Sequence, residues 1–354
     1  MISMNLHFIF FALAFVLSVI VTGLVRIVMQ KYGIVDHADG KISRKIHTRS
    51  TPLGGGVALY LTFFILVLIV WMVRGAFNGS ALLGLFIGST ILMIGGVIDD
   101  KYVLRPRYQI ISPILACLIV IFFGIGPHSI SSPFGGMIDL SYFQWSLGSL
   151  IHIVLFADVF VFVWLFGMMF TTKFLDGLDG LVAGIVTIAA LVMYLVSIQS
   201  QWYDPQVAIL SIIFAGTCLG FLLWNFNPAK IFLGEGGSLL TGFILGSLAI
   251  MSKSKIAITF MVMGIPMIDV IRVIVMRVRK GKPIYIGDRE HLHYRLLESG
   301  LNQRQAVILL YAISSLFGMT TLFLQAEHRL IALSFLFILM LLLGLWLSKR
   351  EPSR

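Results

Sequence analysis

Long apolar runs separated by short polar segments cover most of this chain. An α-helix needs about 20 apolar residues to cross a hydrocarbon core of about 30 Å, and most of the runs approach that length. They are too long for the strands of a membrane barrel, and a helix satisfies its own backbone groups within lipid. We therefore predict eleven membrane-spanning helices, at residues 5–28, 53–73, 81–98, 108–125, 153–171, 181–199, 206–225, 237–252, 256–276, 305–325 and 329–348.

The predicted fold class is an all-α polytopic membrane protein, built as one catalytic domain over residues 1–354. Two connecting segments, 126–152 and 277–304, stand out between the predicted spans. In the first of them, Gly135-Gly136 lies between short alternating segments, which predicts either a small β-hairpin or a plain connector.

Composition supports the membrane assignment. Hydrophobic residues make up 58% of the chain and charged residues 12%, with a mean hydropathy of +0.98, which excludes a water-soluble fold. The net charge is +10, but the basic residues lie between apolar spans, which weighs against nucleic acid binding.

Cys117 and Cys218 each lie inside an apolar run and are predicted to be core residues. The first run lacks a basic n-region and a cleavage site, so we expect a retained helix and no signal peptide.

The distribution of basic residues predicts the orientation. With the loops numbered alternately, seventeen Lys and Arg residues fall in one set and three more in the C-terminal tail, twenty in total, against four in the other set. The positive-inside rule places the richer set in the cytoplasm, so the N-terminus lies outside and the C-terminus inside. Loop 277–304 is then cytoplasmic and loop 126–152 is outside.

Acidic residues fall on the predicted cytoplasmic side, although the charge rule does not use them. Asp99 and Asp100 end the third span, Asp176 and Asp179 lie in the next cytoplasmic loop, and Glu235 lies in the following one. Carboxylates beside hydrocarbon are costly and tend to mark a function. Asp288, His291 and His293 follow in the large cytoplasmic loop.

Such a cluster predicts phosphoryl chemistry. Several carboxylates on one face repel one another unless a cation neutralises them, and their hard oxygen atoms suit Mg²⁺. Gly234, Gly236 and Gly237 are expected to leave backbone N–H groups free near the start of the eighth span, where they can cradle phosphate oxygens. The basic and histidine-containing loops add positive charge for a pyrophosphate. These residues are Lys45, His47, Arg289, His291 and His293.

Each feature also has a plainer interpretation. An Asp-Asp pair is often only a solvated helix end, and an Asp-Gly pair is often only a turn. Glu235 can complement the start of its own helix. Asp269, inside the ninth span, is either functional or a structural partner of Arg272. These interpretations would all have to hold together on one side of the membrane.

Five segments together resemble the polyprenyl-phosphate N-acetylhexosamine-1-phosphate transferase family, which is glycosyltransferase family 4. The resemblance runs over most of the chain, and the five motifs occur in the family's order. They are Arg44-Lys-Ile-His47 with Thr51-Pro-Leu-Gly-Gly-Gly56; Gly96-Val-Ile-Asp-Asp-Lys-Tyr102 with Arg107; Asp176-Gly-Leu-Asp-Gly-Leu181; Asn225-Phe-Asn-Pro-Ala-Lys-Ile-Phe-Leu-Gly-Glu-Gly-Gly-Ser238; and Pro266-Met-Ile-Asp269 with Asp288-Arg-Glu-His-Leu-His293.

The resemblance implies an activity and a set of roles. A UDP-linked amino sugar donates its sugar 1-phosphate to undecaprenyl phosphate, giving a lipid-linked sugar pyrophosphate and UMP, with Mg²⁺ as the cofactor and Mn²⁺ as an alternative. Asp99, Asp100 and Glu235 are then the metal carboxylates, with the two aspartates also serving the lipid phosphate. The other implied catalytic residues are Asp176 and Asp179 at the nucleotide and His291 and His293 at the donor. The implied substrate-binding residues are Lys45, His47, Lys173, Asn225, Gly236 and Arg289.

The His-Leu-His pattern also favours one branch of the family. It resembles the branch that starts O-antigen, common-antigen and teichoic-acid linkage units, usually with UDP-GlcNAc, whereas the peptidoglycan branch carries consecutive histidines and uses UDP-MurNAc-pentapeptide. The resemblance implies a multi-pass protein of the bacterial inner membrane whose site faces the cytoplasm. A homodimer is compatible with this interpretation.

The chain departs from the family pattern at three positions. Lys173 replaces an asparagine, Glu235 replaces an aspartate, and Tyr294 takes the place of the last histidine. Lys173 can pair with an acid or bind phosphate. The departures leave an inactive scaffold as one alternative. A transporter is the other, although its charges would be expected near the bilayer midplane with repeated broken helices.

Overall fold

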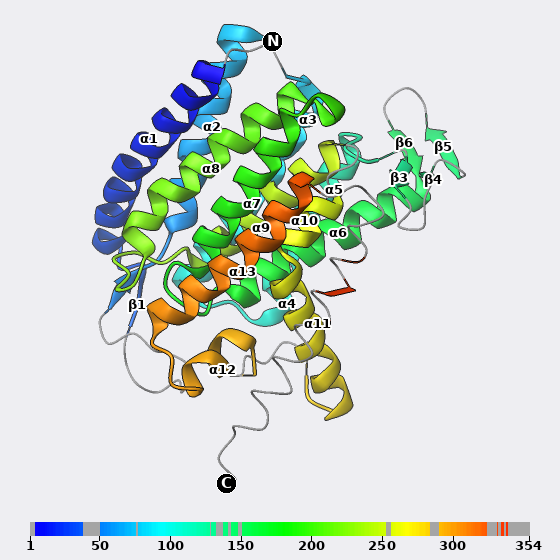
Figure 1. The fold of residues 1–354 in the computed structure, drawn as a ribbon. Helices are drawn as coiled ribbons and strands as arrows, with labels where there is room; N and C mark the ends of the chain where they lie inside the picture. The colour runs from blue at the N-terminus through cyan, green and yellow to red at the C-terminus, as the bar shows by residue number, and fades with distance from the viewer. Residues whose placement is uncertain are drawn as a thin grey trace.

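The computed structural model describes residues 4–37, 50–75, 77–127, 129–131, 137–140, 143–147, 151–252, 256–283 and 290–323, with 331, 334–335 and 338. Over these residues the chain is a bundle of helices with three two-stranded antiparallel ladders (Figure 1). The helices are α1 (Met4–Lys31), α2 (Gly55–Arg74), α3 (Gly79–Tyr102), α4 (Pro106–Gln109), α5 (Ile111–Phe122), α6 (Leu155–Leu175), α7 (Leu181–Ser197), α8 (Pro205–Asn225), α9 (Gly234–Met251), α10 (Ile256–Val262), α11 (Gly264–Arg279), α12 (Leu292–Glu298) and α13 (Gln303–Phe323). The strands are β1 (Val35–Asp36), β2 (Thr51–Pro52), β3 (Ser129–Ser131), β4 (Met137–Asp139), β5 (Gln144–Leu147) and β6 (Ile151–Val154).

The helical class is confirmed, and the number of spans is not established as eleven. In the part of the chain that the structure describes, seven helices are long and apolar enough to cross a membrane, or eight if α10 and α11 count as one span. The predicted span 256–276 is broken, because α10 and α11 meet at an angle of 76°. Pro266 in the first turn of α11 lacks the N–H that a continuous helix would use. The predicted span 329–348 lies mostly outside the described residues.

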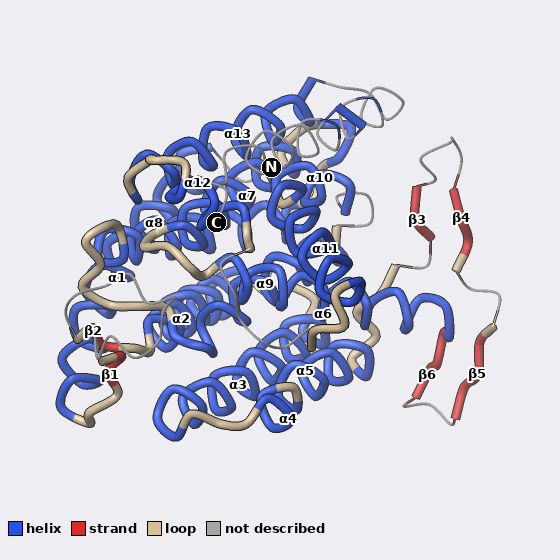
Figure 2. Tube along the Cα trace, turned by 90° about the horizontal axis from the view of Figure 1, so that it is seen from below, coloured by secondary structure: helices blue, strands red, loops and turns tan. Residues whose placement is uncertain are grey.

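The segment 126–152 contains strands, which matches the hairpin alternative. Ser129 pairs with Asp139 between β3 and β4, and Gln144 pairs with Val154 between β5 and β6. Both ladders lie beside the end of the bundle where α6 begins (Figures 1 and 2).

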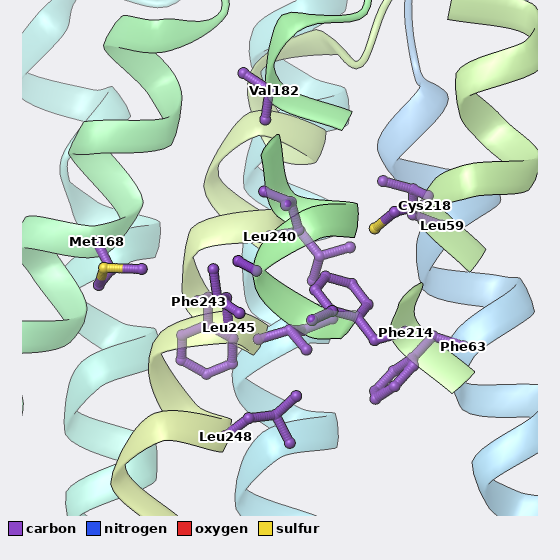
Figure 3. Close-up of a cluster of buried hydrophobic side chains, with 14 of the residues drawn as sticks. Leu59, Phe63, Met168, Val182, Phe214, Cys218, Leu240, Phe243, Leu245 and Leu248 are labelled. Atoms are coloured by element: carbon purple, nitrogen blue, oxygen red, sulfur yellow. The ribbon is translucent and has the colours of Figure 1, made fainter. Parts of the chain in front are cut away.

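Helix α9 lies at the centre of the bundle. It contacts α2, α3, α6, α7, α8 and α10, and sixteen of its eighteen residues are buried. Figure 3 shows Leu240 and Phe243 of α9 in one apolar cluster with Phe214 of α8 and Phe63 of α2. Cys218 belongs to the same cluster, and both cysteines are fully buried, which confirms them as core residues.

Glycines let α9 approach its neighbours closely. A Cβ atom on Gly96 of α3 would overlap the backbone of Gly236, and one on Gly56 of α2 would overlap the backbone of Gly237. Small residues have this role between membrane helices, where lipid gives no hydrophobic drive for association. The contacts place the ends of α2 and α3 directly beside the first turn of α9.

We predict that Gly96→Ala separates α3 from α9, because the new methyl group meets backbone atoms that cannot rotate away. The expected loss of stability is about 1–3 kcal/mol, typical of an overpacked core, and it is measured as a lower unfolding temperature in detergent. Gly167→Ala in α6 is the matched control, since a Cβ there meets nothing within 4 Å. An unchanged unfolding temperature in Gly96→Ala would contradict this account of the helix contact.

Candidate active site

The predicted acidic residues meet at one end of the bundle. Asp99 and Asp100 end α3, Asp176 follows α6, Asp179 precedes α7, and Glu235 lies in the first turn of α9. This is the end at which β1, α4 and α12 lie, at the bottom of Figure 1. The convergence predicted from the sequence is therefore present in the fold.

Asp100 joins α3 to α9. Its Oδ1 accepts a hydrogen bond of 2.8 Å from the backbone N–H of Glu235, one of the N–H groups at the start of α9 that have no partner within the helix. Gly234 has a φ of 75°, and a Cβ there would overlap the Asp100 carboxylate. A carboxylate at a helix N-terminus is also favoured by the helix dipole. The N–H of Glu235, between the glycines predicted to cradle phosphate, is thus donated to Asp100.

Asp99 fixes the turn from α3 to α4. Its Oδ1 accepts the backbone N–H of Leu104 at 2.7 Å, and the side-chain amide of Gln109 donates to Oδ1 and Oδ2 at 3.1 and 3.2 Å. Asp99 is 8% exposed. The sequence offers no signal for Gln109, which lies in a short helix between two longer apolar ones.

Lys173 reaches this cluster from α6. Its Nζ forms an ion pair with Glu235 and donates to Oε1 of Gln109 at 3.2 Å. The prediction that this lysine can pair with an acid is confirmed. An ion pair thus links Glu235 to Lys173, and hydrogen bonds link Lys173 to Gln109 and Gln109 to Asp99.

Asp176 carries an unusual protonation equilibrium. The surrounding protein raises the pKa of this carboxyl group to about 8, first by displacing water around it and then through the negative charges of Glu235, Asp100 and Asp179. Burial is the first cause of this shift and the neighbouring carboxylates add to it, so Asp176 takes up a proton at a higher pH than an ordinary aspartate.

Asp179 and Asn225 hold the loop before α9. Oδ2 of Asp179 accepts the amide of Asn227 at 2.9 Å and the backbone N–H of Ala229 at 3.0 Å. Asn225 accepts the N–H of Gly180 and donates to the carbonyl of Ile231. Both residues therefore have structural contacts, and their predicted roles toward substrate stay predictions.

The plainer interpretation of Asp269 is confirmed in part. Arg272 donates to its Oδ1 at 2.8 Å, as predicted, but His291 also contacts its Oδ2 through Nδ1 at 2.9 Å, and the N–H of Leu292 donates to both oxygens. Asp269 thus orients His291. The rings of His291 and His293 stack with centroids 5.7 Å apart.

His293 is buried beneath the loop that carries Asp176. It is 1% exposed, its Nε2 makes no hydrogen bond with the described residues, and a Cβ on Gly177 would overlap it. Burial, and then the charge of His291, lower the pKa of His293 to about 3. Tyr294, at the position of the third departure, packs beside His293 with ring centroids 4.3 Å apart.

An apolar groove of about 480 Å³ opens beside the acidic residues, between α3, α4 and α5. Asp99 and Glu235 lie in its wall, and the rest of the lining is mostly apolar, including Ile94, Ile111 and Leu115. These three side chains are also exposed on the outside of the bundle. Accessible apolar side chains and the two carboxylates therefore lie in the same groove.

The remaining predicted site residues either have a packing role or lie outside the described residues. Gly236 is buried against α3, so helix packing explains its lack of a side chain. Lys45, His47, Arg289 and Asp288 lie outside the described residues. In the described ranges, no group of three or more acidic, histidine or cysteine side chains is arranged to hold a metal ion.

Comparison with known proteins gives a consistent result. The sequence profile of glycosyl transferase family 4 matches residues 82–253. The chain is 27% identical to a probable undecaprenyl-phosphate N-acetylglucosaminyl 1-phosphate transferase of Bacillus subtilis, over 93% of this chain and 88% of the relative. It is 29% identical to a decaprenyl-phosphate N-acetylglucosaminephosphotransferase of Mycolicibacterium smegmatis, over 84% and 77%. It is 30% identical to a phospho-N-acetylmuramoyl-pentapeptide-transferase of Halalkalibacterium halodurans, over 78% and 83%.

The buried neutral His293 predicts a specific sensitivity to acid. Below pH 6.5 the unfolded chain binds a proton at this residue that the folded protein does not, so folding stability falls as the pH falls toward 3. The penalty is about 2 kcal/mol at pH 5, at about 1.4 kcal/mol per pH unit. His293→Gln cannot take up the proton, so its unfolding temperature should drop less than that of the wild type between pH 7.5 and about pH 5.

His37→Gln serves as the control for this measurement, because His37 is exposed and should leave the wild-type response unchanged. Equal drops in the wild type and His293→Gln would show that His293 is not held neutral.

Proposed function

The chain belongs to glycosyl transferase family 4, and we propose that it transfers GlcNAc 1-phosphate from UDP-GlcNAc to undecaprenyl phosphate with release of UMP. One observation carries the proposal: the carboxylates of Asp99 from α3 and Glu235 from α9 lie in the wall of an apolar groove whose lining includes exposed apolar side chains. Two of the relatives named above act on a polyprenyl phosphate and N-acetylglucosamine.

The groove suits the lipid acceptor. A prenyl chain is apolar, and the exposed side chains of Ile94, Ile111 and Leu115 can receive it from the bilayer. Its phosphate then lies near Asp99 and Glu235. An oxygen of this phosphate attacks the phosphorus atom that bears the sugar, the bond from that phosphorus to the UMP oxygen breaks, and UMP leaves.

Mg²⁺ is the proposed cofactor, with Mn²⁺ as an alternative. The donor set fits: the available ligands are carboxylate oxygens, and the negative charges of Glu235, Asp100 and Asp179 add to the effect of burial on the pKa of Asp176. Mg²⁺ commonly keeps several waters and is held by one or two carboxylates and substrate phosphates, so it does not require a complete protein shell. Asp100 and Glu235 would hold it. When bound, it neutralises charge on the diphosphate during transfer.

The remaining residues would bind and orient the substrates. Asp176, next to Glu235 and Asp100, would meet the donor, and Asp269 would orient His291 through the contact of its Oδ2 with the imidazole. Lys45, His47 and Arg289 are proposed to bind the donor's phosphates. We further propose that this end of the bundle faces the cytoplasm of a bacterial cell, where nucleotide sugars are made, and that the product starts a cell-envelope polysaccharide.

The central test is release of UMP by purified protein supplied with undecaprenyl phosphate, Mg²⁺ and a panel of UDP-sugars. We expect release with UDP-GlcNAc. Release only with UDP-MurNAc-pentapeptide would move the protein to the peptidoglycan branch, and no release with any donor would contradict the proposed function.

Variants locate the site in the same assay. Asp99→Asn, Asp100→Asn and Glu235→Gln should each lose about 100-fold or more of turnover, since each removes a charge placed for the reaction. Asp158→Asn is the control: Asp158 lies in the first turn of α6, at the other end of that helix from Lys173, and accepts the backbone N–H of Val154. Wild-type turnover in all three site variants would place the reaction elsewhere.

Orientation has its own test. Lys282→Cys places a reactive thiol just beyond α11, and both native cysteines are fully buried, so background labelling is low. A maleimide that cannot cross the membrane should label this variant only after the cells are opened. Labelling of intact cells would reverse the proposed orientation.

A further inference from the structure

Lys173 brings a positive charge into the acidic end of the bundle. It lies on the last turn of α6, and its ammonium group forms an ion pair with Glu235 on the first turn of α9. Side chains of both residues are about one-fifth exposed, at 19% and 18%. The pair is therefore partly removed from water, where opposite charges interact more strongly than at a fully exposed surface.

Two further contacts hold the ammonium group in place. Nζ donates to Oε1 of Gln109 at 3.2 Å, and it lies 5.5 Å from the centre of the Phe170 ring. Gln109 uses its amide nitrogen for Asp99, so one lysine links two of the carboxylates. The link joins α6 to α9 directly, and to α3 through α4.

The surrounding charge explains what this link does. Asp100 lies beside Glu235 through the backbone hydrogen bond, and the charges of Glu235 and Asp100 both raise the pKa of Asp176. Like charges this close destabilise the fold unless a cation lies among them. The Lys173 ammonium is a cation that the chain itself supplies at this place.

We propose that Lys173 is a positioning residue that serves as the built-in counter-cation of the carboxylate cluster: it holds Glu235 and Asp99 in place before a divalent cation binds, and it releases Glu235 when one does.

The second half of this proposal rests on the proposed function, because it takes a divalent cation as the ligand of the cluster. An ammonium group and a metal ion that share one carboxylate repel each other. The lysine therefore stabilises the metal-free protein and weakens its affinity for the cation. A lysine that only filled space would not have the second effect.

The experiment uses the full-length protein in detergent, without donor or acceptor. Lys173→Met keeps the length of the side chain and removes its charge. In EDTA, its unfolding temperature should fall by several degrees below the wild type. In a Mn²⁺ titration followed by electron paramagnetic resonance, its dissociation constant should be about tenfold lower, because the repulsion is gone.

Two variants serve as controls. Lys173→Arg keeps the charge and should bind Mn²⁺ within a small factor of the wild type. Lys101→Met removes a charge from α3 that lies over the Tyr102 ring and, within the described ranges, forms no ion pair with the cluster, so it should match the wild type in both measurements.

A double variant keeps the test decisive if Lys173→Met is too unstable to purify in EDTA. Lys173→Met with Glu235→Gln removes one charge of each sign, so its stability in EDTA should return toward the wild type. The proposal is overturned if the double variant is no more stable than the single one, or if Lys173→Met binds Mn²⁺ no more tightly than the wild type.

These measurements are independent of turnover. A wild-type protein that releases no UMP, together with the expected shifts in stability and Mn²⁺ affinity, would reject the proposed function and leave the counter-cation role standing.

Discussion

The close approach of α9 to α3 fixes the geometry of the candidate site. Gly96 and Gly236 bring the two backbones together, and Asp100 then reaches the N–H of Glu235 at 2.8 Å. Packing and electrostatics act at the same point, since a side chain on Gly96 would meet the backbone of Gly236, next to the residue whose N–H Asp100 accepts. A displacement of α9 would move its acidic first turn away from both α3 and the groove.

The apolar outer surface and the acidic residues at one end place opposite constraints on the sequence of this bundle. The wide apolar surface tolerates many sequences, whereas the acidic end requires partners for each carboxylate. The described residues meet much of that need internally: Gln109 and Leu104 contact Asp99, Asn227 and Ala229 contact Asp179, and Lys173 contacts Glu235. At Asp176, burial and then the charges of Glu235, Asp100 and Asp179 raise the pKa of the carboxyl group.

The sequence predicts those parts of the structure that follow from the length of the apolar runs and from the distribution of charged residues. Apolar runs give the helices, and the alternation of basic loops assigns Asp99, Asp176 and Glu235 to one side of the membrane. The break between α10 and α11 is not predicted, because hydropathy is continuous across Gly264 and Pro266. The link through Gln109 depends on how a four-residue helix turns the chain back toward α6, which no sequence pattern reveals. Gly236 is predicted to bind phosphate, whereas its packing role depends on which helix crosses α9.

The groove between α3 and α5 has a consequence for the concentration scale on which the acceptor saturates the protein. If the proposed acceptor binds there, it arrives by lateral diffusion within the bilayer, because apolar side chains of the groove are exposed, while the proposed nucleotide sugar arrives from water. Saturation with the acceptor then depends on its mole fraction among the lipids. Saturation with the nucleotide sugar depends on its molar concentration in water. Adding inert lipid or detergent would slow the reaction by surface dilution even at a constant bulk amount of acceptor.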